Sequence, residues 1–106
     1  MFPFTEDCLA ACDIEDARRW YEQKAEGLGR KFTRAVAETY LRIAENPELY
    51  PRVNHRTRKW RIRGFPYGVV YLFDGELVKI VAVLHAKRGP KALTARLPDT
   101  KPITAE

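Results

Sequence analysis

The sequence contains little cysteine and no long hydrophobic run. Cys8 and Cys12 are the only cysteines among its 106 residues, too few for the disulfide framework that stabilises many small secreted domains. The longest apolar run, residues 80–84, is far too short to cross a bilayer. A secretory leader begins with basic residues, but no basic residue precedes Arg18 in this sequence. We therefore expect a cytoplasmic protein that does not act at a membrane.

The sequence also lacks the usual signatures of cofactor and metal sites. It has no Gly-rich phosphate loop and no recognisable Ser-His-Asp arrangement. Cys8 and Cys12 could form a zinc site with His55 and His85, which stand far along the chain. We favour the simpler interpretation that both cysteines are unremarkable thiols, and we expect no metal and no cofactor.

Charge is distributed unevenly along the chain, whose net charge is +5. Residues 1–51 carry seven bases and ten acids, whereas residues 52–91 carry ten bases and only two acids. A basic region of this kind favours a polyanionic partner such as nucleic acid or an acidic protein segment. The alternative is a basic surface that serves only solubility.

Two amphipathic helices are predicted in the first half of the chain. The first spans residues 13–28, with Asp13 as its N-cap and with Gly27 and Gly29 at its end, where glycine readily terminates a helix. The second spans residues 30–45 and stops before a proline. Apolar residues recur at three- and four-residue spacings in both. Because the connection is short, we expect an antiparallel helical hairpin.

The second half of the chain predicts strands. Apolar and cationic residues alternate over residues 60–63, and further strands are expected over residues 67–73 and 77–84. Asp74 and Gly75 between them indicate a two-residue hairpin loop. The nearly continuous apolar character of residues 77–84 predicts burial on both faces. Helices followed by strands predict an α+β fold, in which the helical hairpin packs on a three- to four-stranded antiparallel sheet.

Several segments, in this order and at these distances, resemble the RelE/ParE toxins of type II toxin–antitoxin modules. Residues 13–21 and 27–32 are similar to the family's first helix and its turn, and residues 43–47 to the end of its second helix. Residues 65–71 and 83–90 are similar to the sheet and the exit from it. The resemblance implies a toxin domain over residues 13–92, a lead-in over residues 1–12 and a tail over residues 93–106.

The resemblance implies a growth-arresting toxin that a cognate antitoxin neutralises. RelE-like members are similar to ribonucleases that cut messenger RNA in the ribosome, and ParE-like members share their fold but are linked to poisoning of DNA gyrase. In RelE-like members an arginine often follows the tyrosine that corresponds to Tyr67, but Gly68 stands there in this sequence, and no tyrosine follows Tyr71. These differences favour the ParE-like branch, and a non-enzymatic protein over an endoribonuclease.

A second departure concerns the start of the chain. The family commonly begins with a strand, but Pro3, Thr5, Glu6 and Asp7 interrupt any strand pattern in residues 1–12. We therefore expect this strand to be missing or divergent.

The candidate functional residues fall into three groups. A nuclease would use His85 as acid or base, with Arg88 and Arg61 to stabilise the phosphorane charge. A binding site for the cellular target would gather cations that hold phosphate or carboxylate groups: Arg61, Arg63, Lys87 and Arg88. An antitoxin groove would use Trp20 and Tyr21, because exposed aromatic residues often mark a partner site.

Each group has a simpler structural interpretation. His85 can cap the sheet through a hydrogen bond, and His55 can be an ordinary solvated loop residue. Charged residues on an edge strand prevent edge-to-edge aggregation, and most of the aromatic residues can belong to the core. The sequence thus leaves three functions open: a ParE-like toxin, a RelE-like ribosome-dependent endoribonuclease, and a non-toxic relative that acts as a binding module.

Overall fold

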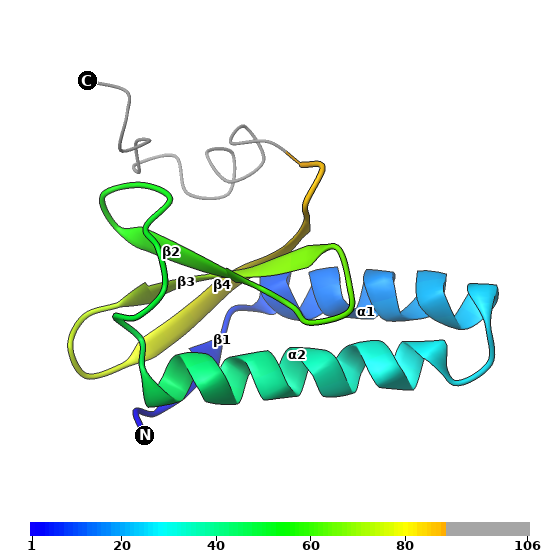
Figure 1. Cartoon of the computed structure of the whole chain (residues 1–106), viewed down its shortest axis with the longest axis horizontal. Coiled ribbons are helices and arrows are strands. Elements are labelled where there is room, and N and C mark those ends of the chain that lie inside the picture. Colours follow the sequence, from blue (N-terminus) through cyan, green and yellow to red (C-terminus); the bar gives the residue numbers. More distant parts are fainter. Residues whose placement is uncertain (89–106) are drawn as a thin grey trace.

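The computed structural model describes residues 1–88, which form two helices and one four-stranded sheet. In chain order the elements are β1 (Phe4–Glu6), α1 (Cys8–Lys24), α2 (Leu28–Glu45), β2 (Thr57–Arg61), β3 (Tyr67–Phe73) and β4 (Val78–His85). The strand order is β1-β4-β3-β2, with β1 parallel to β4 and the other pairs antiparallel. Both helices lie on the same side of the sheet (Figure 1). The predicted α+β fold with a helical hairpin is confirmed. None of the described helices is long and apolar enough to span a bilayer.

Of the two alternatives for the N-terminal strand, missing or divergent, the structure shows the second: a short, polar strand is present. Phe4, Thr5 and Glu6 form β1 and pair with the first part of β4. Pro3 does not prevent this pairing, because only its carbonyl is used: it accepts the Val78 N–H at 3.0 Å. The polar residues are tolerated because this short edge strand is exposed.

The N-terminus of α1 also differs from the prediction. Asp7, not Asp13, is the N-cap, and its carboxylate accepts the Leu9 N–H at 3.1 Å. The helix therefore starts at Cys8 and ends at Lys24. Gly27, with φ of 84°, makes the turn into α2, as the sequence suggested.

Asp13 instead joins α1 to the sheet. The last pair between β1 and β4 is Glu6 with Ile80, and the chain then turns away into α1. Farther along β4, the N–H of Val83 donates to Asp13 Oδ2 at 3.0 Å. A partly buried N–H without an acceptor would be costly. Asp13 thus supplies the acceptor where β1 no longer reaches.

The main core lies between the helical hairpin and the sheet. Phe32, Ile43, Tyr71 and Ile80 are among its fully buried members. A smaller apolar cluster on the other face contains Val70, Val81, Ala82 and Leu84. The predicted burial of β4 on both faces is therefore confirmed.

The hairpin between β3 and β4 is present, but its loop is longer than expected. Phe73 pairs with Val78, so that residues 74–77 form the loop. Asp74 Oδ1 accepts the N–H groups of Glu76 and Leu77, both at 2.8 Å. This Asx-type turn stabilises the longer loop in place of a two-residue turn.

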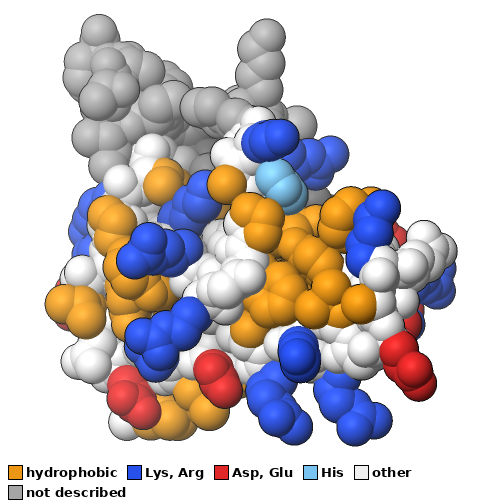
Figure 2. Space-filling view, turned by 45° about the vertical axis from the view of Figure 1, so that its right-hand side comes forward, with side chains coloured by type: hydrophobic (Ala, Val, Ile, Leu, Met, Phe, Trp, Pro, Cys, Tyr) orange, Lys and Arg blue, Asp and Glu red, His pale blue; other side chains and the backbone are white. Residues whose placement is uncertain are grey.

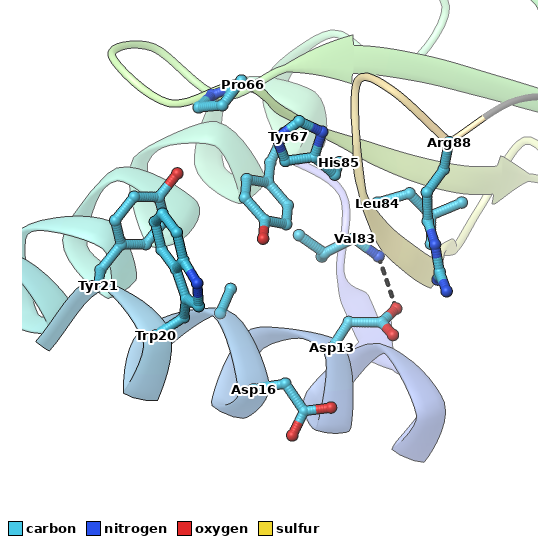
Figure 3. Close-up of a pocket in the computed structure, with 11 residues that line it drawn as sticks. Asp13, Asp16, Trp20, Tyr21, Pro66, Tyr67, Val83, Leu84, His85 and Arg88 are labelled. Atoms are coloured by element: carbon cyan, nitrogen blue, oxygen red, sulfur yellow. Dashed lines mark hydrogen bonds between the residues drawn. The ribbon is translucent and has the colours of Figure 1, made fainter. Parts of the chain in front are cut away.

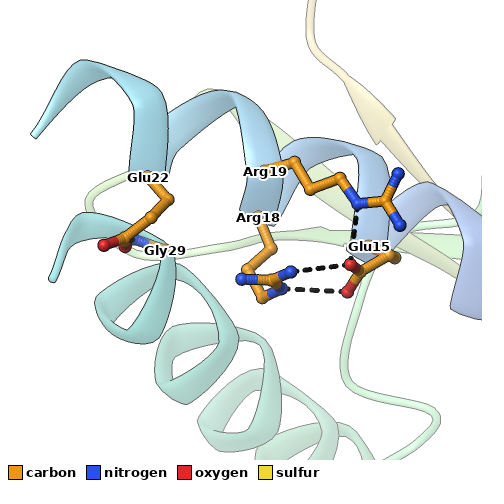
Figure 4. A network of polar contacts seen from close by, with 5 residues as sticks. All are labelled: Glu15, Arg18, Arg19, Glu22 and Gly29. Atoms are coloured by element: carbon orange, nitrogen blue, oxygen red, sulfur yellow. Dashed lines mark hydrogen bonds and ion pairs between the residues drawn. The ribbon is translucent and has the colours of Figure 1, made fainter. Parts of the chain in front are cut away.

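The two helices are joined tightly at the α1–α2 turn (Figure 4). The carboxylate of Glu22 on α1 accepts the N–H groups of Gly27 and Gly29, each at 3.0 Å, and so caps α2 from the neighbouring helix. Gly29 has no room for a side chain, since a Cβ there would lie 2.8 Å from the carbonyl oxygen of Arg18. About two turns earlier on α1, Glu15 pairs with Arg18 at 2.7 Å and with Arg19 at 3.0 Å.

The link between Asp13 and Val83 predicts a specific loss of stability. Asp13→Ala should lower the free energy of unfolding by about 1–3 kcal/mol, because the Val83 N–H loses its acceptor. Asp13→Asn, which keeps an acceptor oxygen, should cost clearly less. The measurement is urea denaturation followed by tryptophan fluorescence. Asp16→Ala, an exposed acid one turn along α1, is the control, and an equal effect of Asp13→Ala and Asp16→Ala would contradict the assignment.

The cap on α2 predicts a dependence of stability on pH. The two N–H donors bind the charged carboxylate, so they hold the pKa of Glu22 below its ordinary value in the folded protein. The stabilisation is complete above the unfolded pKa of Glu22 and is lost as the pH falls through the folded pKa. As the pH is lowered from 7 to 3, the thermal unfolding midpoint should therefore fall less steeply for Glu22→Gln than for the wild type. Glu26→Gln, at the same turn, should behave like the wild type.

Candidate functional site: an aromatic and cationic groove beside β4

A groove of about 700 Å³ lies between α1 and the ends of β3 and β4 (Figure 3). It opens where β1 has ended, so one of its walls is the last part of β4, from Val83 to His85. The opposite wall is α1, whose Asp13, Asp16, Ala17, Trp20 and Tyr21 face the groove. Pro66 and Tyr67 close its upper side, and Arg88 lies at the exit of β4.

Aromatic rings form the apolar part of the groove. Trp20 is 52% exposed, and its ring meets that of Tyr21 edge to face at 5.1 Å. Tyr21 in turn packs edge to face against Phe65 at 4.9 Å, which connects the groove to the core. Figure 2 shows a continuous patch of hydrophobic side chains on one face of the molecule, bordered by Lys and Arg. An exposed tryptophan on a rigid aromatic base is a suitable anchor for a partner.

The two tyrosines of the groove are neutral hydrogen-bonding groups. Burial raises the pKa of Tyr21 above its ordinary value, and the neighbouring Tyr67 adds to this effect. Burial likewise raises the pKa of Tyr67, against the opposing influence of the Arg88 guanidinium. Both phenols therefore remain protonated at neutral pH and can donate a hydrogen bond to a bound partner.

The position of His85 is fixed by the turn that follows β4. Its Nδ1 accepts the N–H of Lys87 at 3.0 Å, and its carbonyl accepts the N–H of Arg88 at 2.9 Å. Its ring packs edge to face against Tyr67 at 5.1 Å. Because Nδ1 acts as an acceptor, the proton of the neutral ring is on Nε2. In this arrangement His85 offers a partner a hydrogen-bond donor, not a basic lone pair.

The structure brings together residues that the sequence assigned to different tasks. Trp20 and Tyr21, predicted to bind the antitoxin, line the same groove as His85 and Arg88, predicted to act on the target. Lys87 is exposed on the turn between these last two.

The remaining predicted cations lie elsewhere. Arg61 and Arg63 line a separate hollow, on the side of α2, together with Arg42. This happens because β3 lies between β2 and β4, and the chain after β2 turns back beside α2. His55 lies in the loop before β2, and it lines a third hollow.

Sequence reasoning missed the acidic side of the groove. Asp13 was interpreted only as a helix cap, and Asp16 was not among the candidate residues. Their spacing to Trp20, seven residues for Asp13 and four for Asp16, places all three on one face of a helix. That spacing was the available signal, and it was obscured by the wrong helix start.

Gly68 lies on the face of the sheet away from the groove. Tyr67 faces the helices, and side chains alternate along a strand, so position 68 faces the opposite side. A Cβ at Gly68 would collide with the side chain of Lys59 on the adjacent strand. An arginine at this position would therefore displace Lys59 and would not enter the groove.

Cys8 and Cys12 are exposed and free on α1. Within residues 1–88, no group of three or more His, Cys, Asp or Glu side chains is arranged to hold a metal ion.

Comparisons with known proteins agree with the fold. A solved structure described as the chromosomal ParDE TA system from P. aeruginosa has the same fold, with a TM-score of 0.59 and 14% sequence identity over 80% of this chain and 96% of that chain. The family model of the ParE toxin of the type II toxin–antitoxin system parDE matches residues 9–90. No curated protein matches the sequence. The protein is thus a type II toxin by class, and the chain belongs to the ParE toxin family.

Proposed function

We propose that this ParE-family toxin arrests growth by acting on DNA gyrase, without cutting RNA, and that a cognate antitoxin neutralises it by occupying the groove beside β4. The observation that carries the proposal is the meeting of Trp20 and Tyr21 with His85 and Arg88 in one groove. An antitoxin segment that is anchored on Trp20 and Tyr21 also covers His85 and Arg88 at the other end of the groove. Neutralisation then follows from direct competition for one surface.

The chemistry of the groove describes the antitoxin segment that fits it. An apolar anchor would pack on Trp20, the large exposed ring of the groove. A basic side chain would pair with Asp16, which is exposed on α1, and an acidic one with Arg88 across the groove. Charge complementarity of this kind fixes the direction of the bound segment.

The arrangement of His85 supports a binding function over catalysis. Cleavage of RNA through the 2′-hydroxyl needs a group that accepts a proton. The Nδ1 lone pair of His85 is used by the Lys87 N–H, and the tyrosines hold their protons at neutral pH. Lys87 and Arg88 are suited to hold an anionic surface of the target.

A RelE-like nuclease is the second candidate function. One observation favours it: Tyr67, His85 and Arg88 surround the same groove, which combines two proton-carrying groups with a permanent cation. In this case Arg88 would stabilise the phosphorane charge, and His85, once its Nδ1 gave up the Lys87 N–H, would take the proton of the 2′-hydroxyl and return it to the leaving oxygen.

Controlled expression of the chain in bacteria separates these functions. We expect growth arrest with intact transcripts and an induced DNA-damage response. Arg88→Gln should restore growth while the protein stays folded. The control is Arg34→Gln, at an exposed position of α2 outside the groove, and this variant should remain toxic. Growth arrest with rapidly cleaved transcripts would contradict the gyrase proposal and support the RelE-like nuclease. Continued growth with soluble, folded wild-type protein would show that the chain acts only as a binding module.

Removal of the Trp20 ring tests the antitoxin groove directly. Trp20→Ala should weaken binding of the cognate antitoxin by about 2 kcal/mol, or roughly 30-fold, as the loss of a central aromatic anchor does. Isothermal titration calorimetry with the purified antitoxin gives this value. Leu49→Ala is the control, since Leu49 is 69% exposed and lies outside the groove. Unchanged affinity of Trp20→Ala would place the antitoxin on another surface.

A further inference from the structure

The exposed edge of the sheet is strongly basic. Residues 52–63, which include all of β2, contain six Arg and Lys residues together with His55, and no acid. The strand order places β2 at one edge of the sheet, on the far side of β3 from the wall of the groove. This basic edge is therefore distinct from the groove of the proposed antitoxin.

A hollow opens at each end of the basic edge. The first, of about 660 Å³, is lined by cations from the loop before β2, from β2 itself and from β4: Arg52, Arg56, Arg58 and Lys79. The second, of about 300 Å³, is lined by Arg42 of α2 and by Arg61 and Arg63. The acids that line them are Glu48 and Asp74 in the first and Glu38 in the second. Cations thus outnumber acids in both.

The loop that begins this edge is held in a fixed conformation. The buried Asn54 accepts the N–H groups of Arg56 and Thr57 through Oδ1, at 2.9 and 2.8 Å. Arg58 donates to the backbone carbonyls of Glu48 and Tyr50. The loop therefore presents its other cations from a rigid base, which lowers the entropy cost of binding an anion.

The cations beyond the loop are available to a partner. Arg61 and Arg63 are exposed, and within the described part of the chain no carboxylate forms an ion pair with either of them. The guanidinium of Arg61 lies 5.7 Å from the ring centre of Trp60, which holds its side chain in place.

We propose that this basic edge binds the phosphate backbone of duplex DNA. The five residues of β2 span roughly 16 Å at about 3.3 Å per residue, so the two hollows are separated by a few backbone phosphates. Arginine binds phosphate through paired hydrogen bonds. Contacts of this kind carry no base specificity, so the binding is independent of sequence.

The aromatic residues near the edge favour a duplex over a single strand. Proteins that bind single strands stack the bases on exposed rings. Trp60 is packed against Tyr50 at 4.7 Å, and Phe65 against Phe32 at 5.2 Å, and neither ring is among the exposed large hydrophobic residues. The edge therefore offers cations to a backbone without a platform for unstacked bases.

Fluorescence anisotropy tests this proposal. The probe is a labelled DNA duplex of about 20 base pairs, and the protein is the full chain from cell-free synthesis. We expect a dissociation constant in the micromolar range at about 50 mM salt. The logarithm of the affinity should fall with the logarithm of salt concentration with a slope of about −3, which corresponds to about three neutralised phosphates. No antitoxin, gyrase or living cell is involved, so the result is independent of the proposed function.

Matched variants locate the binding surface. The triple variant Arg56→Gln, Arg61→Gln, Arg63→Gln should lose at least tenfold in affinity and most of the salt dependence. The control triple Arg30→Gln, Lys31→Gln, Arg34→Gln removes the same charge from exposed positions of α2 and should lose no more than about threefold. Arg61→Lys with Arg63→Lys should keep most of the affinity, because the charges remain.

Three outcomes would overturn the proposal. The first is no binding of the duplex at low salt, which would leave the charges as protection of an edge strand. The second is equal weakening by the two triple variants, which would show a general effect of net charge. The third is tighter binding of a single strand, of a duplex RNA or of an acidic peptide than of duplex DNA.

Discussion

The early end of β1 determines most of the features that matter for function. Asp7 caps α1, so the chain leaves the sheet after three paired residues and covers only the first part of β4. A longer β1 would have completed the pairing and left no groove. Instead α1 crosses beside the uncovered part of β4, and Asp13 satisfies the Val83 N–H there. This hydrogen bond, together with the packing of Ala10, Ala17 and Tyr21 in the core, fixes α1, and with it Trp20, beside β4.

The groove and the basic edge are built on different strands of the sheet. One wall of the groove is β4, whereas the basic edge is β2, and β3 separates them. A molecule with this layout can hold a peptide on one side and an anionic surface on the other. The hairpin of α1 and α2, locked by Glu22 and Gly29, keeps the aromatic wall in a fixed orientation to both.

The sequence predicted the elements whose signals are local. Helical periodicity and Gly27 located the hairpin, the alternation of apolar and cationic residues located β2, and runs of β-branched, aromatic and apolar residues located β3 and β4. The strand β1 could not be predicted in this way, because it is held by distant partners: the Tyr40 hydroxyl donates to Glu6 at 2.7 Å, and Phe4 packs on the Tyr40 ring at 5.5 Å. Likewise, Trp20 and Arg88 were candidates individually, but their meeting depends on where β1 stops. Arg61 and Arg63 were expected near Arg88, and only the strand order shows that β3 intervenes.

The way β4 is covered has a consequence for self-association. Its sequence is the most apolar stretch of the chain, and segments of this kind readily add strands from other molecules when their edge is open. In this fold β1 blocks the first half of that edge, and the carboxylate of Asp13 occupies the second. A charged side chain held against an open strand edge repels an incoming strand that would need the same N–H. Asp13, which borders the groove, thus also protects the open part of the β4 edge against pairing with another copy of the chain.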